Sequence, residues 1–166
     1  EEVDLMASGR TDAGVHAFGQ VANFKTNSNI PIEKIPIALN SNLKKSIRII
    51  SAEEVDERFH SRLTCKRKTY RYVINNSEFS SAIYRNLETH IPQKLDIEKM
   101  KQAAKYFEGE HDFKAFKASG TSSKSSVRII YKAVVYEVPN NRIYIELTGN
   151  GFLYNMVRII AGTLVD

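Results

Sequence analysis

The alternation of apolar and polar residues predicts two long strands in the second half of the chain. Residues 127–138 and 142–147 carry apolar side chains at alternate positions, a pattern typical of strands with one buried face. Between them, Pro139-Asn140-Asn141 has the composition of a hairpin turn. Residues 69–74 alternate in the same way and predict a third strand, whose two tyrosines share one face.

Apolar residues at helical spacing predict two helices and a third that is short or interrupted. Residues 97–108 form one apolar stripe, with Asp96 as N-cap and Gly109 as the end of the helix. Residues 152–165 predict a largely buried helix. Residues 31–43 also have helical spacing, but the proline at position 36 favours a break.

The remaining segments predict shorter elements and loops. An apolar run over 3–7 and the segments 15–24 and 47–55 read as strands, and the segment Gly120–Ser123 reads as a mobile loop. Strands and helices are mixed without a regular βαβ alternation, and no internal repeat is visible. We therefore predict an α+β fold, with an antiparallel sheet and helices packed on one face.

The charge of the chain favours a polyanionic partner. It has 24 Lys and Arg against 19 Asp and Glu, a net charge of +5 and a pI near 9.3. Two stretches contain cations and no acid, residues 58–71 and 113–136. Solvated strand and loop faces would also carry charge, but such faces normally mix both signs. We therefore favour a surface that binds nucleic acid over an ordinary solvated surface.

Composition also argues against other classes of protein. No apolar stretch approaches the roughly 18 residues that cross a bilayer, so we expect no membrane association. The single cysteine, Cys65, excludes an internal disulfide and suits a reducing, cytoplasmic location. The four histidines lie far apart without metal-site spacing, so we expect no metal.

The loop from Ser8 to Ala17 is the strongest candidate for chemistry. It places Asp12 between Arg10 and a glycine-bracketed turn, on a connection between two predicted strands. The arginine could keep the carboxylate ionised or grip a phosphate. An Asx-type turn, in which Asp12 only caps its own loop, explains the local residues equally well.

Several ordered motifs carry a family resemblance. The string GRTDAGVHA at 9–17, followed by GQV, resembles the signature of the tRNA pseudouridine synthase A family. Lys68-Thr69-Tyr70-Arg71-Tyr72 is similar to the family's K/R-x-Y-R-Y strand, and residues 151–162 are similar to its F-x-x-x-M-V-R-x-x-x-G helix. The turn from Asp112-Phe113 to Phe116 resembles its D-F-x-x-F motif. The likeness covers nearly all of the chain.

The resemblance implies roles for individual residues. Asp12 would be the nucleophile, Arg158 its ion-pair partner, and Tyr70 would lie against the target base or ribose. Arg10 would position the RNA backbone or help to extrude the base. The apolar neighbours of Arg158 imply a buried or half-buried cation, although an arginine that reaches solvent along its helix is the alternative. A tyrosine in an alternating strand is otherwise more often a core residue. Further cations are candidates for RNA-backbone contact: Arg58, Lys66, Arg67, Lys68 and Arg71.

The resemblance also implies a reaction, a partner and a fold. The reaction is isomerisation of uridine to pseudouridine in tRNA, on the 3′ side of the anticodon stem-loop at nucleotides 38–40, by a cofactor-free homodimer with the pseudouridine synthase fold. The aspartate would attack C1′ or C6, or a glycal would form. An RNA binder without chemistry is the second hypothesis. A metal-dependent nuclease, the third, would need clustered carboxylates and histidines.

The same motifs predict how the chain is divided. We expect residues 1–57 to be the remainder of an N-terminal α/β subdomain with the catalytic loop, 58–68 a basic connection, and 69–166 a C-terminal α/β subdomain. Family members carry a strand and a helix before the GRTDAG loop. We therefore expect these residues to be a fragment of the full enzyme, with less activity than the full-length protein.

Overall fold

The computed structural model describes residues 2–9, 11–120 and 125–166. It divides into two compact units, which are described separately below. The first unit comprises Glu1–Arg10 and Ala17–Thr64, and the second comprises Thr11–His16 and Cys65–Asp166. The division after Thr64 falls inside the segment predicted as a basic connection. Part of the predicted Gly120–Ser123 loop lies outside the described residues.

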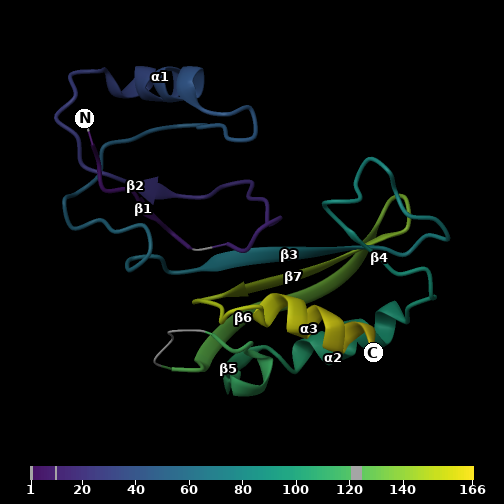
Figure 1. Cartoon of the computed structure of the whole chain (residues 1–166). Coiled ribbons are helices and arrows are strands. Elements are labelled where there is room, and N and C mark those ends of the chain that lie inside the picture. Colours follow the sequence, from purple (N-terminus) through teal and green to yellow (C-terminus); the bar gives the residue numbers. More distant parts are fainter. Residues whose placement is uncertain (1, 10, 121–124) are drawn as a thin grey trace. The chain divides into compact units, whose positions relative to one another are not determined.

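A five-stranded sheet forms the second unit (Figure 1). Its strand order is β4-β3-β7-β6-β5, and all neighbours are antiparallel except β3 and β4. The predicted α+β fold is therefore confirmed, and the sheet predicted as antiparallel is so except for the β3–β4 pair. The strand bounds are β3 Lys68–Asn75, β4 Thr89–His90, β5 Gly109–Asp112, β6 Val127–Val138 and β7 Arg142–Gly149.

The three strands predicted from alternation are present as β3, β6 and β7. Asn140 and Asn141 have φ angles of 67° and 53°, so the left-handed backbone that asparagine tolerates closes the β6–β7 hairpin. Beyond an irregularity near Ile130, β6 and β7 pair regularly, with Val138 opposite Arg142. Alternate residues of β7 are fully buried, as a sheet with one covered face requires.

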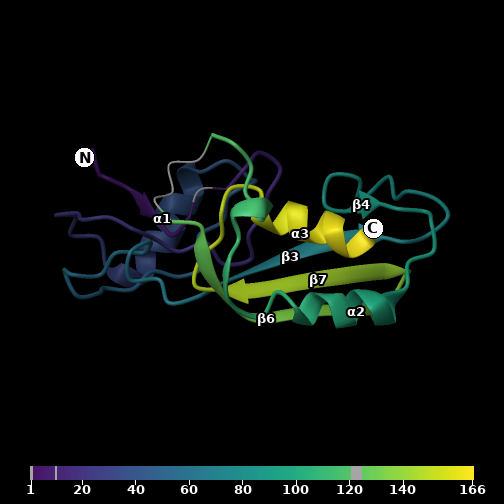
Figure 2. The same cartoon turned by 90° about the horizontal axis from the view of Figure 1, so that it is seen from below.

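Helices α2 (Ile97–Lys105) and α3 (Met156–Val165) contribute to one apolar core with the sheet (Figures 1 and 2). Asp96 caps α2 as predicted, because its side chain accepts a hydrogen bond from the Lys99 N–H at 3.1 Å. Both helices are shorter than predicted. Residues 152–155 lie before α3, with a turn at 154–155, yet they still bury Leu153. The fully buried core side chains include Ile74, Phe113, Ile130, Ile143, Ile145, Leu147, Met156 and Ile160.

A buried ion pair ties the segment before β4 to the end of the sheet. The Glu88 carboxylate, 3% exposed, accepts a hydrogen bond from Arg142 Nε at 2.5 Å and another from Asn75 Nδ2 at 2.8 Å. The Arg142 guanidinium also lies 4.4 Å from the centre of the Tyr84 ring, a cation–π arrangement. Each charge therefore has a partner, as buried charges require.

The first unit contains little regular structure. Its two strands, β1 (Met6–Ala7) and β2 (Ala22–Asn23), pair antiparallel, and Ser61 Oγ donates to Met6 O at 2.8 Å. The helix at 31–43 is short, as predicted, but the proline at position 36 does not break it: a 3₁₀ turn, η1 (Ile32–Lys34), leads directly into α1 (Ile35–Asn42), with the proline in its first turn.

Two strands predicted in the first unit are wrong or shorter than expected. Of residues 15–24, only β2 is in a strand, and residues 47–55 are not in one. Instead of a neighbouring strand, the Asn40 side chain bonds both backbone groups of Ile49, at 2.8 Å and 2.9 Å. Local alternation indicates which side chains avoid water, but a strand also needs a partner, which the pattern cannot supply.

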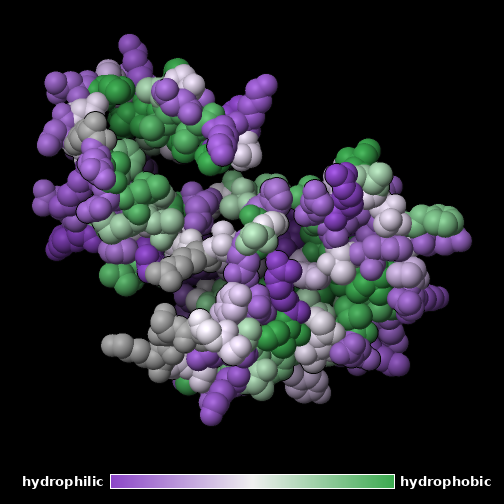
Figure 3. Space-filling model, viewed as in Figure 1, coloured by the Kyte–Doolittle hydropathy of each residue, from purple (hydrophilic) through white to green (hydrophobic). Residues whose placement is uncertain are grey.

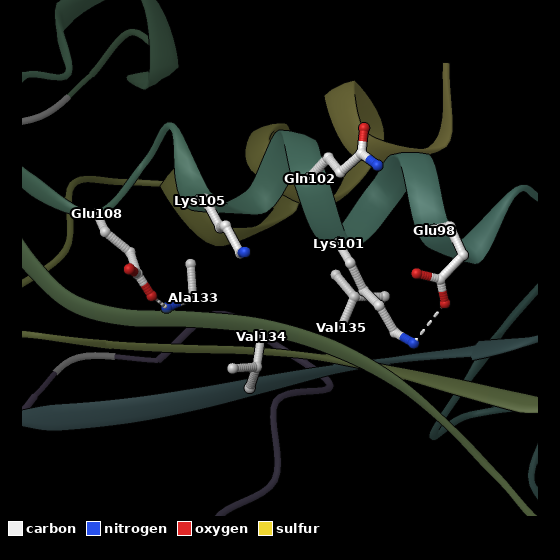
Figure 4. A pocket seen from close by; sticks show the side chains of 8 residues that line it. All are labelled: Glu98, Lys101, Gln102, Lys105, Glu108, Ala133, Val134 and Val135. Atoms are coloured by element: carbon white, nitrogen blue, oxygen red, sulfur yellow. Dashed lines mark hydrogen bonds and ion pairs between the residues drawn. The ribbon is translucent and has the colours of Figure 1, made fainter.

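A groove of about 450 Å³ lies between α2 and β6 (Figure 4). Three of its four charged side chains are engaged in local contacts: Lys101 pairs with Glu98 at 2.7 Å, and Glu108 accepts a hydrogen bond from the Ala133 N–H at 2.8 Å. None of the predicted site residues lines this groove. We interpret the groove as a consequence of the packing of α2 beside β6, without a role in ligand binding.

Both apolar and hydrophilic side chains are exposed on the surface. In the view of Figure 3, apolar residues are interspersed with hydrophilic ones. The exposed apolar residues include Phe18 in the first unit and Ile83 in the second. Within the described part of the chain, no helix combines the length and apolar character needed to span a bilayer.

Gly149 allows a close approach at the end of β7, and its replacement should destabilise the second unit. A Cβ at this position would lie 2.7 Å from Ile129 O and 3.0 Å from Ile130 Cδ1. We expect Gly149→Ala to lower the free energy of unfolding by about 1–3 kcal/mol. Gly162→Ala is the control, because open space surrounds this helical position and the change should stabilise by about 0.5–1 kcal/mol. Urea unfolding measures both, and equal effects would contradict the packing argument.

Candidate functional site

Asp12 lies in a tight turn. The residues just before this turn, Ser8 and Gly9, are held by hydrogen bonds to residues of the first unit. In the first unit, the Ser8 N–H donates to Val21 O at 2.8 Å and Gln20 Nε2 donates to Gly9 O at 2.9 Å. In the second unit, the Val15 N–H donates to the backbone carbonyl of Asp12 at 3.2 Å, and Gly14 has a φ of 83°. The hydrogen bond that closes the turn is thus accepted by the backbone carbonyl of Asp12.

The Asp12 carboxylate is half-buried, and no hydrogen bond joins it to another described residue. This observation argues against the Asx-type turn, which would use the side chain to cap the loop. The side chain therefore remains available to act on a ligand.

Tyr70 is held on the covered face of the sheet. It is the third residue of β3, opposite the buried Leu147 of β7, and its ring is half-buried. Burial raises the pKa of the Tyr70 phenol above 10.0, and the negative charge of Asp12 raises it further, followed by a contribution from Cys65. Asp12 and Tyr70 therefore act on each other electrostatically within the second unit.

The raised pKa determines the form of Tyr70. A phenol whose pKa lies above 10.0 keeps its proton at neutral pH, so its hydroxyl can donate a hydrogen bond or a proton. Deprotonation would place a second negative charge near Asp12. The arrangement consequently favours a neutral tyrosine beside an anionic carboxylate.

Removing the Asp12 charge should lower the pKa of Tyr70. We expect the phenolate absorbance of Tyr70, isolated by subtracting the titration of Tyr70→Phe, to appear above pH 10.0 in the parent and at lower pH in Asp12→Asn. Because the folded pKa exceeds the unfolded one, the burial of neutral Tyr70 contributes stability below about pH 10 that is lost as pH rises toward the folded pKa. An unchanged titration in Asp12→Asn would show that the charge of Asp12 does not affect the pKa of Tyr70.

Arg158 is exposed, so the expectation of a buried or half-buried cation is wrong. Helix α3 buries Met156, Ile160, Ala161 and Leu164. At 100° per residue, position 158 lies about 200° from both Met156 and Ile160, on the opposite side of the helix. Its apolar neighbours in sequence therefore do not surround it in space. The ion pairs between described residues do not include one between Arg158 and Asp12.

The other predicted cations occupy different environments. Arg10 lies outside the described residues, and Lys66 and Arg67 are exposed. Arg58 pairs with Asp56 at 3.0 Å. Arg71 pairs with Glu146 at 2.7 Å and lies 4.5 Å from the centre of the Tyr144 ring. Lys68 is half-buried at the start of β3.

Phe152, the first residue of the helix motif, contacts Tyr70, and the sequence did not predict this contact. The centroids of the two rings are 5.1 Å apart at an interplanar angle of 79°, an edge-to-face contact. Antiparallel pairing of β3 with β7 places Gly149 opposite Lys68, so the residues after β7 return to the start of β3. A prediction of this strand register would have placed Phe152 near Tyr70.

The part of the chain that the structure describes contains no group of three or more His, Cys, Asp or Glu residues suited to holding a metal ion. Asp12 and Tyr70 are the candidate site residues that the electrostatics connect. They place a carboxylate near a neutral phenol.

Comparisons with known proteins identify the family. The sequence profile of tRNA pseudouridine synthase matches residues 1–63 and 103–166. The tRNA pseudouridine synthase A of Thermoanaerobacter sp. (strain X514) is 53% identical over 164 residues, which cover 99% of this chain and 67% of the relative. That of Ruminiclostridium cellulolyticum is 53% identical over 165 residues, covering 99% and 67%. That of Bacillus pumilus (strain SAFR-032) is 47% identical over 166 residues, covering 100% and 67%.

These similarities define an enzyme of the isomerase class, built on a mixed α+β fold. The chain belongs to the tRNA pseudouridine synthase family. The resemblance inferred from the ordered motifs is confirmed.

Proposed function

We propose that this chain carries the catalytic groups of an enzyme that isomerises uridine to pseudouridine in tRNA, with Asp12 as the nucleophile. The observation that carries the proposal is the electrostatic influence of Asp12 on Tyr70 within one unit. It supports a site in which a carboxylate and an aromatic ring face the same substrate.

The proposed chemistry needs one nucleophile and no external reagent. Along any of the three routes, through C1′, C6 or a glycal, the C1′–N1 bond breaks and a C1′–C5 bond forms. The proton lost from C5 is balanced by one gained at N1. A carboxylate suits this reaction because it is anionic at neutral pH and can form and release a covalent adduct without a separate base.

Tyr70 would hold the extruded nucleotide. The glycosidic bond is inaccessible inside a stacked helix, so the base must leave the stack, and an aromatic ring can receive it. The neutral phenol also supplies a hydroxyl that can donate a proton while the base is detached. The phenolate form, which a general base would require, is disfavoured by burial and by Asp12.

Arg158 is proposed as the cation that pairs with Asp12 when RNA is bound. Its exposed guanidinium can reorient, and its planar fork matches a carboxylate or a phosphate. For Arg10, Arg58, Lys66, Arg67, Lys68 and Arg71 we propose roles at the RNA backbone, or for Arg10 in extruding the base. Lys66 and Arg67 are exposed, which supports their proposed contact with the RNA backbone. The Glu146 pairing of Arg71 makes it the weakest member of this set.

For the substrate, we propose the 3′ side of the tRNA anticodon stem-loop, as the family resemblance implies, and for the active form a cytoplasmic homodimer. Sedimentation of the natural protein that contains these residues tests the dimer, and a purely monomeric active enzyme would exclude it. Mapping the modified nucleotides in one tRNA tests the region.

The reaction should be observed directly with the natural protein that contains this chain. Incubation with tRNA carrying tritium at uridine C5 should release tritium as pseudouridine forms. We expect Tyr70→Leu to lower turnover by about 10- to 100-fold, since it removes both ring and hydroxyl. Tyr70→Phe separates them, because full activity would exclude proton transfer and leave stacking. Binding of tRNA without tritium release would favour the second hypothesis, an RNA binder without chemistry.

A further inference from the structure

We infer that Phe152 is a positioning residue for Tyr70: its ring, held between the end of β7 and the start of β3, fixes the orientation of the Tyr70 ring in the site. The inference rests on the proposed function and extends it by one residue. Phe152 acts here through Tyr70 and has no assigned contact with substrate.

The backbone before Phe152 is clamped to β6. The Asn150 N–H donates to Ile129 O, and Asn150 Oδ1 accepts from the Ile129 N–H, both at 3.0 Å. This two-way contact fixes the exit of the chain from β7, since it satisfies both backbone groups of one residue. The position from which the Phe152 side chain departs is consequently set by the sheet.

The ring of Phe152 is confined on two sides. A Cβ on Gly149 would lie 3.5 Å from Phe152 Cζ, so the tip of the ring approaches the glycine backbone. The ring also meets Tyr70 edge to face at 5.1 Å and packs against the core cluster. A ring confined in this way leaves Tyr70 few alternative rotamers.

The effect on the site follows from what surrounds Tyr70. Burial is the largest cause of its raised pKa, and Phe152 is the aromatic ring in contact with it. Without that ring, water would reach the phenol and its pKa would fall toward 10.0. The ring would also gain freedom to turn away from Asp12. Small displacements of a catalytic group have large kinetic effects, up to about 100-fold per ångström.

The matched control is another edge-to-face pair in the same core. Phe107 and Phe116 have ring centroids 5.2 Å apart at 89°, and both pack against the same apolar cluster. Phe107→Leu therefore removes an equivalent aromatic contact without touching Tyr70. A purely structural role for Phe152 predicts the same behaviour for Phe152→Leu and Phe107→Leu.

The experiment compares these two variants by three measurements. Thermal unfolding should give similar losses for both. The titration of Tyr70, isolated with Tyr70→Phe subtraction, should move to lower pH in Phe152→Leu and stay in place in Phe107→Leu. Turnover of tRNA at saturation should fall about tenfold in Phe152→Leu alone.

A double-variant cycle tests whether Phe152 acts through Tyr70. In the Tyr70→Leu background, the further change Phe152→Leu should have little additional effect on turnover, because the group that it positions is gone. Equal fold-losses in both backgrounds, or an unmoved titration in Phe152→Leu, would overturn the inference. The titration does not require activity. A protein that makes no pseudouridine would therefore refute the proposed function while still testing the positioning.

Discussion

Asp12→Asn should abolish pseudouridine formation while tRNA binding and thermal stability stay close to those of the parent. The amide has nearly the shape of the carboxylate but cannot attack as an anion, so we expect a loss of at least about a thousandfold in turnover, as for other enzymes that lose their nucleophile. The carboxylate has no hydrogen bond with another described residue, so its replacement should cost the fold little. Tritium release from C5-labelled tRNA measures the reaction.

Asp4→Asn is the matched control for this prediction. It makes the same chemical change at an exposed carboxylate earlier in the chain and should leave turnover unchanged. Filter binding of tRNA distinguishes lost chemistry from lost recognition. Pseudouridine formation by Asp12→Asn within a few-fold of the parent rate would remove the nucleophile from the proposed mechanism.

Glu88→Ala should have the largest effect on stability. The change leaves Arg142, whose side chain is 16% exposed, without its carboxylate, and it also removes the acceptor of the Asn75 amide. Breaking a buried ion pair on one side costs about 3–5 kcal/mol, and we expect about 3 kcal/mol because Arg142 keeps some access to water and the Tyr84 ring. Urea unfolding provides the measurement.

Glu98→Ala provides the comparison for the buried pair. Glu98 and Lys101 form a contact of 2.7 Å, against 2.5 Å for the buried pair, but their side chains are 76% and 43% exposed. Such a surface pair contributes about 0–1 kcal/mol. Equal losses in the two variants would show that burial of Glu88 does not determine its contribution.

The sequence predicted the second unit better than the first, for a physical reason. In β6 and β7 the two-residue period matches a sheet with one covered face, and the asparagines of the turn tolerate the left-handed backbone that closes it. The cap at Asp96 is equally local. By contrast, residues 47–55 alternate without being in a strand, because pairing depends on residues distant in sequence.

The candidate site followed the same rule. Two separate motifs identified Asp12 and Tyr70, whereas the electrostatic influence of one on the other depends on their proximity in the folded chain. Arg158 shows the opposite failure, since its burial was inferred from neighbours in sequence and the helical period places it on the exposed side. The contact between Phe152 and Tyr70 was missed because it follows from strand register, which composition does not reveal.

The contact between Glu108 and the Ala133 N–H satisfies a backbone donor of β6 just beyond the part of the strand that pairs with β5. An unpaired N–H on a sheet edge invites the carbonyl of another chain and can start edge-to-edge aggregation. Here a carboxylate already occupies that donor in the middle of β6 and brings a negative charge to the edge. The contact therefore leaves one backbone donor fewer on this strand for the carbonyl of another chain.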